Sequence, residues 1–405
     1  MDTNSMIFRL KERLTIAIAI CTLSACGGGN SSNMQKDVPT SAHQTALNSK
    51  DKAKVEFNYQ KLIDDLVSDE IHGIILHVST PNRTFTGSSG TANLTTQATL
   101  QPDAVYHLAS TGKVFTALLA VQLHQAGILD LDATIDTWLS PEIIEQIEYG
   151  TEITLRQLLN HSSGVYNYSD PRSNDAYVEF VLANYDKGIT NQDFVQFALG
   201  QPAYFKPGKG AEYSNSNYAL AGMILDSVLG HPNAHAMRDQ IIDRLELGNT
   251  FSVGIENQFG EITPGYEKQN GEYINTWPIL SHVTSASTPV ASTVTELSTL
   301  MDNIFNNEQW LSSQAREDLI GDKSRVSVSP GLEYVLGLWK EDMQGYTVYH
   351  HNGGNHGYVS NNLYIPELNT SVVYFLNCGL NDKCLDAFQT IERAVMESIL
   401  ARPKV

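Results

Sequence analysis

A serine and a lysine stand three residues apart at the start of an apolar stretch, as Ser110 and Lys113. Residues with this spacing share one face of a helix, with β-carbons about 5–6 Å apart, so the hydroxyl and the amine could share a hydrogen bond. A hydroxyl beside an amine is the arrangement of a nucleophile with a neighbouring base. The pair therefore indicates nucleophilic catalysis, although a serine here could equally act as an ordinary helix cap.

The surrounding sequence distinguishes this pair from a serine and a lysine that have the same spacing by chance. The same spacing recurs at Ser49 and Lys52, within a polar stretch. Residues 114–123, by contrast, are apolar almost all round, which is typical of a buried helix. A lysine at the start of a buried helix needs partners for its amine. The context favours Ser110 and Lys113 as the functional pair.

The composition is that of a globular, acidic protein. The chain has 405 residues, of which 41% are apolar, enough for a substantial core. Its formal net charge is -19. Such acidity disfavours nucleic acids and anionic membrane surfaces as partners.

Residues 1–25 have the form of a secretion signal. Basic residues from Arg9 to Arg13 precede the apolar run 14–20, which is too short to cross a bilayer. The Leu-Ser-Ala-Cys that ends at Cys26 resembles the lipobox of bacterial lipoproteins, in which the cysteine carries lipid.

This resemblance predicts a cleaved signal peptide over residues 1–25 and a lipid anchor on Cys26. Residues 26–54 are polar and glycine-rich at the start, which predicts a flexible tether, and one folded domain is expected over 55–405. Gly27 rather than aspartate after the cysteine resembles outer-membrane sorting. The expected location is the bacterial cell envelope, on the periplasmic face of the outer membrane.

Cys378 and Cys384 are the two cysteines that follow the expected anchor. In an oxidising compartment a disulfide between them would contribute about 2 kcal/mol by loop closure. Two free thiols remain the alternative, because sequence does not give their geometry.

Three further polar positions invite a functional interpretation. Tyr213 and Asn215 lie in a polar loop before an apolar helical run, where they could cap that helix or reach a neighbouring serine and lysine. His161 lies in a turn without an evident acidic partner, which favours a histidine that holds the loop locally.

A group of histidines stands at His350, His351 and His356, among glycines. No cysteine ligand, acidic residue of matching spacing or His-Glu-x-x-His helix accompanies them, so neither a metal nor a cofactor is expected. Glycines at a strand edge more often indicate that something approaches the backbone closely.

The hydrophobic pattern predicts a hairpin near the start of the domain and an antiparallel block near its end. Thr293 and Glu296 have the spacing of a capping box that opens a helix through Phe305. The expected elements are strands at 71–78 and 83–87, helices at 110–126, 153–159, 293–305 and 385–400, and strands at 334–339, 346–351, 358–365 and 371–376.

Three short motifs occur in the order found in serine penicillin-recognising enzymes. They are Ser110-Thr111-Gly112-Lys113, Tyr213-Ser214-Asn215 and His351-Asn352-Gly353. The chain from about residue 71 to 400 thus resembles the superfamily of class C β-lactamases and serine DD-carboxypeptidases, which includes many esterase-like relatives. The resemblance implies an α+β fold, with an antiparallel sheet of five or more strands flanked by helices, an inserted helical subdomain and an active site in the groove between them.

The resemblance also implies roles for the motif residues. Ser110 would be the acylated nucleophile and Lys113 the partner that takes or relays its proton. A lysine must be desolvated or placed beside another cation to act as a base, so Tyr213 is a shared candidate and the identity of the base stays open.

The remaining motif residues would bind the substrate. Asn215 would hold Lys113 and a substrate amide, and His351, with Gly353 in the same motif, would face a substrate carboxylate or polar group. The backbone amides of Ser110 and Gly354 would form the oxyanion hole. Gly112, His350 and the segment 285–289 depart from common family residues, which bears on substrate preference more than on mechanism.

The leading hypothesis is a lipid-anchored serine hydrolase, most like a D-alanyl-D-alanine carboxypeptidase acting on peptidoglycan-type peptides. An esterase or a β-lactamase using the same site is the close alternative, with an ester or a β-lactam as substrate. A surface binding protein without turnover is the alternative from a different class. The Ser110, Lys113 and Tyr213 set argues against it, because a binder needs no nucleophile beside a base.

Overall fold

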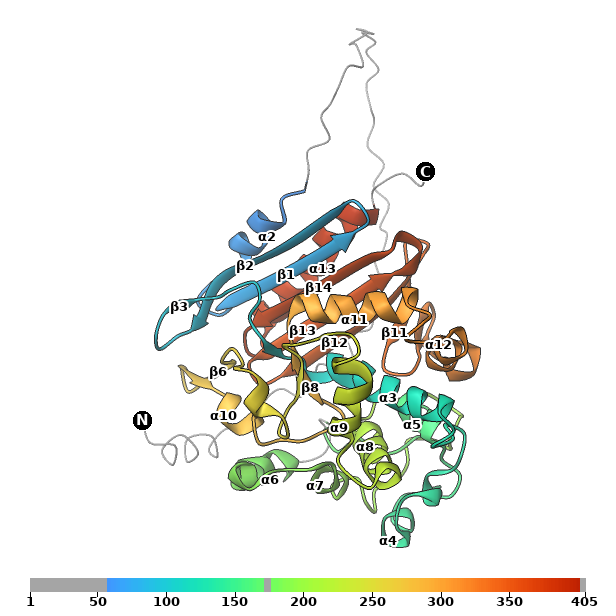
Figure 1. Ribbon diagram of the computed structural model, residues 1–405. Helices are drawn as coiled ribbons and strands as arrows, with labels where there is room; N and C mark the ends of the chain where they lie inside the picture. Colours follow the sequence, from blue (N-terminus) through green and yellow to red (C-terminus); the bar gives the residue numbers. More distant parts are fainter. Residues whose placement is uncertain (1–56, 171–175, 401–405) are drawn as a thin grey trace, which may run out of the picture.

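The computed structural model describes residues 57–170 and 176–400 (Figure 1). The expected signal peptide, Cys26 and the tether over 26–54 lie outside these residues. Within the described ranges no helix combines the length and the apolar character needed to cross a bilayer.

One large antiparallel sheet forms the upper layer of the molecule in Figure 1, in the order β3-β2-β1-β14-β13-β12-β11-β10-β9. Its strands are β1 (Gly73–Thr80), β2 (Arg83–Asn93), β3 (Ala98–Thr99), β9 (Val326–Ser329), β10 (Leu332–Tyr334), β11 (Trp339–Met343), β12 (Tyr346–Asn355), β13 (Tyr358–Ile365) and β14 (Thr370–Asn377). The smaller sheets contain β4 (Tyr106–His107), β8 (Val290–Ser292) and β5 (Phe251–Ser252), and the hairpin β6 (Tyr266–Gln269) and β7 (Glu272–Asn275).

The α-helices either cover the sheet or form the region below it (Figure 1). They are α2 (Tyr59–Leu66), α3 (Lys113–Gln125), α4 (Pro141–Ile144), α5 (Leu155–Leu159), α6 (Ala176–Asn184), α7 (Asn191–Val195), α8 (Asn215–Leu229), α9 (Asn233–Met237), α10 (Trp277–Leu280), α11 (Val294–Asn306), α12 (Ser313–Ile320) and α13 (Asp382–Leu400). Short helical turns are η1 (Ala109–Gly112), η2 (Ile135–Thr137), η3 (Tyr185–Lys187), η4 (Arg238–Ile242), η5 (Asn257–Phe259), η6 (Asp322–Ser324) and η7 (Pro366–Leu368).

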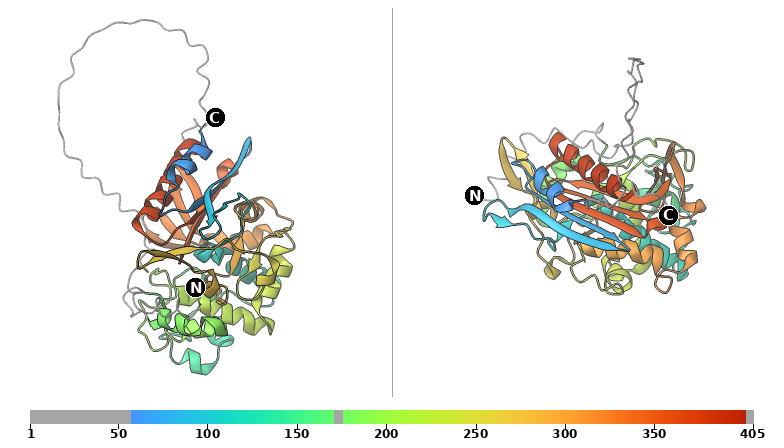
Figure 2. Two further views of the ribbon diagram at one scale, coloured as in Figure 1. Left: turned by 90° about the vertical axis from the view of Figure 1, so that its left-hand side faces the viewer. Right: turned by 90° about the horizontal axis from the view of Figure 1, so that it is seen from above.

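Helices cover both faces of the large sheet. Helices α2 and α13 lie over one face, as the right-hand view of Figure 2 shows, and α11 packs against β1 and β14 from the other. Strand β1 is central, and its side chains alternate: Ile74 and Leu76 join the core under α13, whereas Ile75 joins the core shared with α3 and α8. This explains the continuous apolar run that the sequence shows there.

The helical region is inserted between the two halves of the sheet. Strands β1 to β3 precede it in the chain, strands β9 to β14 follow it, and β1 pairs with β14 throughout, from Gly73 with Asn377 to Ser79 with Ser371. The expected α+β architecture, with a flanked antiparallel sheet and an inserted helical subdomain, is therefore present.

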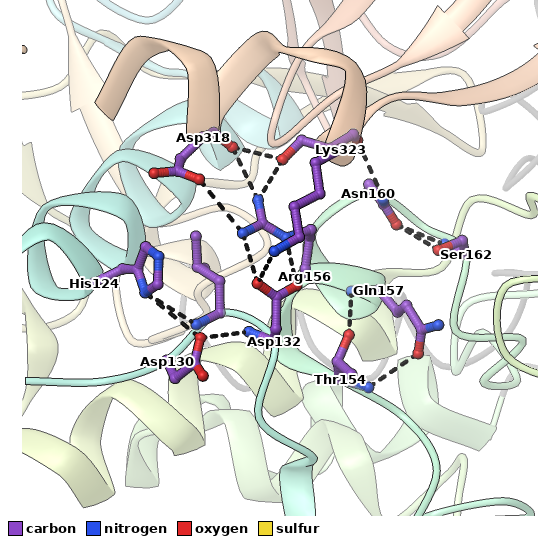
Figure 3. Close-up of polar contacts among 12 residues, drawn as sticks. His124, Asp130, Asp132, Thr154, Arg156, Gln157, Asn160, Ser162, Asp318 and Lys323 are labelled. Atoms are coloured by element: carbon purple, nitrogen blue, oxygen red, sulfur yellow. Dashed lines mark hydrogen bonds and ion pairs between the residues drawn. The ribbon is translucent and has the colours of Figure 1, made fainter. Parts of the chain in front are cut away.

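A buried arginine joins α5 of the helical region to the segment that leads into β9 (Figure 3). Arg156 donates to both carboxylate oxygens of Asp132, at 2.8 and 3.1 Å, and to Ser324 Oγ at 2.6 Å. Asp318 lies 3.5 Å from the same guanidinium, and Lys323 binds Asp132 from the surface. The hydrogen bonds from Arg156 and Lys323 hold the pKa of Asp132 at about 2.

Two expected elements differ in detail. The strand expected at 334–339 is two strands, because Gly337 has a φ of +76° and the chain reverses there between β10 and β11. The capping box at Thr293 is only half formed. Thr293 accepts from the Glu296 amide, but the Glu296 carboxylate turns away to accept from the Asn249 amide.

Cys378 and Cys384 are joined by a disulfide with their Cα atoms 5.9 Å apart. The bond links the residue after β14 to the first turns of α13, and both cysteines are buried. Of the two alternatives left by the sequence, the structure contains the bonded one.

Candidate active site

Ser110 lies on the short turn η1, three residues before α3 begins at Lys113. The preceding residue, Ala109, has a φ of +49°, a conformation that costs a non-glycine residue about 1–3 kcal/mol and persists only when its surroundings fix it. One fixing contact is local, because the Ala109 amide donates to His107 Nδ1 at 3.0 Å. The pair expected on one helical turn is therefore formed by a 3-10 turn followed by a helix.

Strands β12 and β13 hold the same turn from the other side. Thr111 Oγ1 donates to the His351 carbonyl at 3.0 Å, and Ser360 Oγ donates to the Leu108 carbonyl at 2.7 Å. Gly353 lies against this turn so closely that a Cβ there would stand 2.4 Å from Leu108 O. The glycine expected to mark a close backbone approach thus permits the contact between β12 and the nucleophile's turn.

The Lys113 side chain is fully buried and makes three hydrogen bonds. Its Nζ lies 3.0 Å from Ser110 Oγ, 2.8 Å from Asn215 Oδ1 and 2.8 Å from the Ser287 carbonyl oxygen. The rings of Tyr213 and Tyr218 lie 5.0 and 5.3 Å from Nζ, which favours a cation through their faces.

This arrangement suits proton exchange with Ser110. The amide oxygen of Asn215 and the carbonyl of Ser287 can only accept, so they take two N–H groups of Lys113. The third direction faces a hydroxyl, which can accept from an ammonium or donate to a neutral amine. The geometry therefore accommodates Lys113 before and after it takes the Ser110 proton.

Asn215 is itself held on both sides at the start of α8. Its backbone amide donates to Asn167 Oδ1 at 3.0 Å, and its Nδ2 donates to Ser169 Oγ at 2.8 Å. Because Nδ2 is engaged, Oδ1 is turned toward Lys113.

Tyr213 lies between Lys113 and His161. The His161 ring centroid is 4.3 Å from that of Tyr213, and His161 Nδ1 accepts from the Ser214 amide at 3.3 Å. His161 has a φ of +62° and is buried, and burial together with the nearby Lys113 charge holds its pKa well below the usual range. A neutral histidine that supports the Tyr213 loop agrees with the loop-holding interpretation from sequence.

His351 requires a correction to its expected role. Its ring is buried, with Nδ1 donating to the Asn352 carbonyl at 2.6 Å and Nε2 accepting from the Tyr334 hydroxyl at 2.9 Å. Burial, followed by the Lys113 charge, holds the pKa of His351 well below its usual range. With both nitrogens engaged inside the protein, this side chain does not face a substrate; it anchors β12 next to the nucleophile.

A cavity opens from Ser110. Ser110, Asn215, Ser287 and Gly354 line one part of it, so Gly354, from which an oxyanion-hole amide is expected, borders the same cavity as the nucleophile. Apolar side chains of α6 and α10 line another part. The cavity thus combines the nucleophile and three neighbouring residues with a surface suited to an apolar substituent.

Several site groups were missed by sequence reasoning. The Ser287 carbonyl binds Lys113, but a backbone oxygen has no residue signature. His107 and Ser360 fix the nucleophile's turn through contacts that only folding creates. The one available signal was for His107, since a histidine three residues before the nucleophile in an apolar setting needs a local partner.

The histidines around β12 do not gather into a metal site. Among residues 57–170 and 176–400, no group of three or more histidine, cysteine, aspartate or glutamate side chains is arranged to hold a metal ion. His350 instead lies 3.3 Å from Glu341, and His356 lies 3.7 Å from Glu267.

Comparison with known proteins identifies the family. A model described as Beta-lactamase matches residues 59–393. The chain belongs to the β-lactamase family. It is a serine hydrolase of the type that includes the penicillin-binding proteins, in agreement with the resemblance seen in its motifs.

Curated proteins and solved structures similar to this chain include penicillin-binding proteins and amidohydrolases. Penicillin-binding protein 4* of Bacillus subtilis (strain 168) is 31% identical over 176 residues, covering 42% of this chain and 36% of that protein. The matched segments span less than half of the length of such curated relatives. A D-stereospecific amidohydrolase from Streptomyces sp. is 27% identical with a TM-score of 0.67, covering 81% of this chain and 96% of that one.

The D-amino acid amidase of Ochrobactrum anthropi SV3, solved in complex with D-phenylalanine, shares the fold. Its TM-score is 0.68 at 22% identity, covering 84% of this chain and 98% of that one.

Proposed function

We propose that the protein hydrolyses an amide or ester bond through an acyl-enzyme on Ser110. The observation that carries the proposal is the Lys113 amine 3.0 Å from Ser110 Oγ, held there by Asn215 and Ser287. No such three-point placement of a lysine is needed for a helix cap or for a binding protein.

In the proposed first step, Ser110 Oγ attacks the substrate carbonyl carbon and its proton passes to Lys113, with Tyr213 as the second candidate. The backbone amides of Ser110 and Gly354 stabilise the oxyanion. The bond to the leaving group then breaks, and the leaving group takes the proton. Water attacks the acyl-enzyme in the second step, its proton passes through the same pair, and Ser110 is regenerated with the free acid.

The first substrate hypothesis is a D-alanyl-D-alanine peptide, cleaved as by a carboxypeptidase. It is supported by the motif order and by the likeness to penicillin-binding proteins. A β-lactam or a simple ester could acylate the same serine.

The second hypothesis is an amidase that acts on amino acid amides. One observation favours it: the residues that line the cavity, all within the described ranges, include no lysine or arginine to bind a terminal carboxylate. The Streptomyces amidohydrolase is a relative of this kind.

The test is labelling of the purified protein with a general serine-reactive phosphonate and with a reporter penicillin, followed by peptide mass spectrometry. Ser110 should carry the label, and Ser110→Ala and Lys113→Met should each abolish it. Thr111→Ser is a matched control, because it keeps the hydroxyl that donates to His351 O. Labelling that persists in Ser110→Ala would refute the proposal.

We also propose that Cys26 carries lipid and holds residues 55–405 at the periplasmic face of the outer membrane through a tether over 26–54. The lipobox-like sequence supports this proposal. Cys26→Ser should move the protein from the membrane fraction to the soluble periplasmic fraction. An unchanged distribution would contradict it.

A further inference from the structure

Two hydrogen-bond acceptors from one strand stand on the cavity wall. Glu267 and Gln269 lie two residues apart on β6, so their side chains are on the same face of the hairpin, and both line the cavity that contains Ser110. Lys268, between them, is exposed. The hairpin therefore presents a carboxylate and an amide, and not its lysine, to the site.

Both side chains have a buried oxygen without a hydrogen-bond partner, Oε2 of Glu267 and Oε1 of Gln269. His356 Nδ1 lies 3.7 Å from Glu267 Oε2, which is within ion-pair range when the ring is protonated but beyond hydrogen-bond distance. Buried polar groups in folded proteins are nearly always satisfied, and an unpaired one is costly. Two such acceptors on the same wall of one cavity indicate a ligand that donates hydrogen bonds to both.

The charge of the pair defines that ligand further. A carboxylate beside an amide oxygen favours a cation with several N–H groups, which describes a primary ammonium. The cavity lining contains no lysine or arginine, which leaves His356 as the lining side chain that can carry a positive charge beside Glu267. The net charge of -19 would also attract a cationic substrate.

The rest of the cavity complements an apolar group. Val178, Val181 and Leu182 of α6 line it together with Ile279 and Leu280 of α10. A hydrophobic side chain of the substrate would be transferred from water into this apolar part of the cavity, and that transfer lowers the free energy of binding. The lining thus combines an ammonium subsite and an apolar subsite with one nucleophile.

We propose that Glu267 and Gln269 bind the protonated free amino group of the substrate. The substrate class is an amide or ester of an amino acid, with an unblocked amino group and an apolar side chain. This inference rests on the proposed acyl-enzyme chemistry at Ser110. Such a subsite distinguishes an enzyme that binds the free amino group of its substrate from a carboxypeptidase that binds the terminal carboxylate.

The test compares phenylalanine p-nitroanilide, as both enantiomers, with its N-acetyl derivative. In the natural protein the free amine should be the better substrate. Glu267→Gln keeps the shape and removes the charge, so kcat/KM for the free amine should fall about 10- to 100-fold, while the N-acetyl compound changes less than about 2-fold. Gln269→Leu should act in the same direction by a smaller factor. Glu261→Gln is the matched control, because it makes the same charge change at an exposed position before the hairpin and outside the cavity lining.

A second measurement does not depend on turnover. Phenylalanine amide should slow phosphonate labelling of Ser110 more than N-acetylphenylalanine amide does, and Glu267→Gln should remove that difference. If labelling occurs but the ratio between free and acetylated compounds is the same in Glu267→Gln as in the natural protein, the ammonium subsite is refuted and the proposed function stands. If Ser110 is neither labelled nor needed for any hydrolysis, the proposed function fails and the subsite proposal fails with it.

Discussion

Replacement of His107 tests whether a buried histidine holds the turn that presents Ser110. His107 Nδ1 accepts the amide hydrogen of Ala109, whose φ of +49° is strained. Asparagine can place Oδ1 near the position of Nδ1, so His107→Asn keeps an acceptor without a titrating ring, whereas His107→Ala removes the acceptor. An unpaired buried amide costs about 1–3 kcal/mol. At pH 7.5, His107→Ala should therefore lower the free energy of unfolding by about that amount, whereas His107→Asn should largely keep the value of the natural protein.

The pH dependence of the free energy of unfolding allows the contribution of His107 to be predicted more closely. Burial lowers the pKa of His107 to about 4, below the unfolded value of about 6.5. The folded state therefore binds fewer protons than the unfolded state between these values, and the stabilisation present above pH 6.5 is lost as the pH falls toward 4. Between pH 7.5 and pH 4.5 this single ring accounts for a loss of about 2.5 kcal/mol.

The assay is urea unfolding of the natural protein and of His107→Asn at both pH values. Other buried histidines, such as His77 with a pKa of about 4, titrate equally in both proteins and cancel in the difference. The natural protein should lose about 2.5 kcal/mol more than His107→Asn on acidification. Parallel losses would refute the reasoning, and unchanged Ser110 labelling in His107→Ala would show that the turn does not depend on this ring.

Three further changes probe the supports of the site. Gly353→Ala should destabilise the fold by about 1–3 kcal/mol and slow Ser110 labelling, because its Cβ would meet Leu108 O; equal labelling rates would contradict the close contact. Arg156→Met should lower the free energy of unfolding by about 3–5 kcal/mol, since it leaves the carboxylates around it without their buried partner, and a loss below about 1 kcal/mol in urea titrations would show the network to be dispensable. Cys384→Ser should cost about 2 kcal/mol in non-reducing buffer and nothing further when reductant is added, in contrast to the natural protein.

The sequence predicted the nucleophile, its lysine and the sheet that supports them because each has a local signature. Ser110 and Lys113 are specified by residue type and spacing. Strand β1 is specified by its continuous apolar run, because its two faces pack into two different cores. The motif indicates a substrate-facing His351 side chain, but its Nε2 accepts a hydrogen bond from Tyr334, seventeen positions away on another strand, a contact that only folding creates. The Ser287 carbonyl could not be predicted, since its part in the site is a matter of backbone position alone.

The pairing of β1 with β14 determines when the active site can form during folding of the newly made chain. Gly73 and Asn377 are neighbours in the sheet although 304 positions separate them (377 − 73), and the turn of Ser110 is bonded to β12 and β13. Closing so long a loop is entropically costly and slow, and it cannot begin before the last strand exists. A chain still being synthesised therefore carries Ser110 and Lys113 without a complete site, and hydrolytic competence arises only with the final strands.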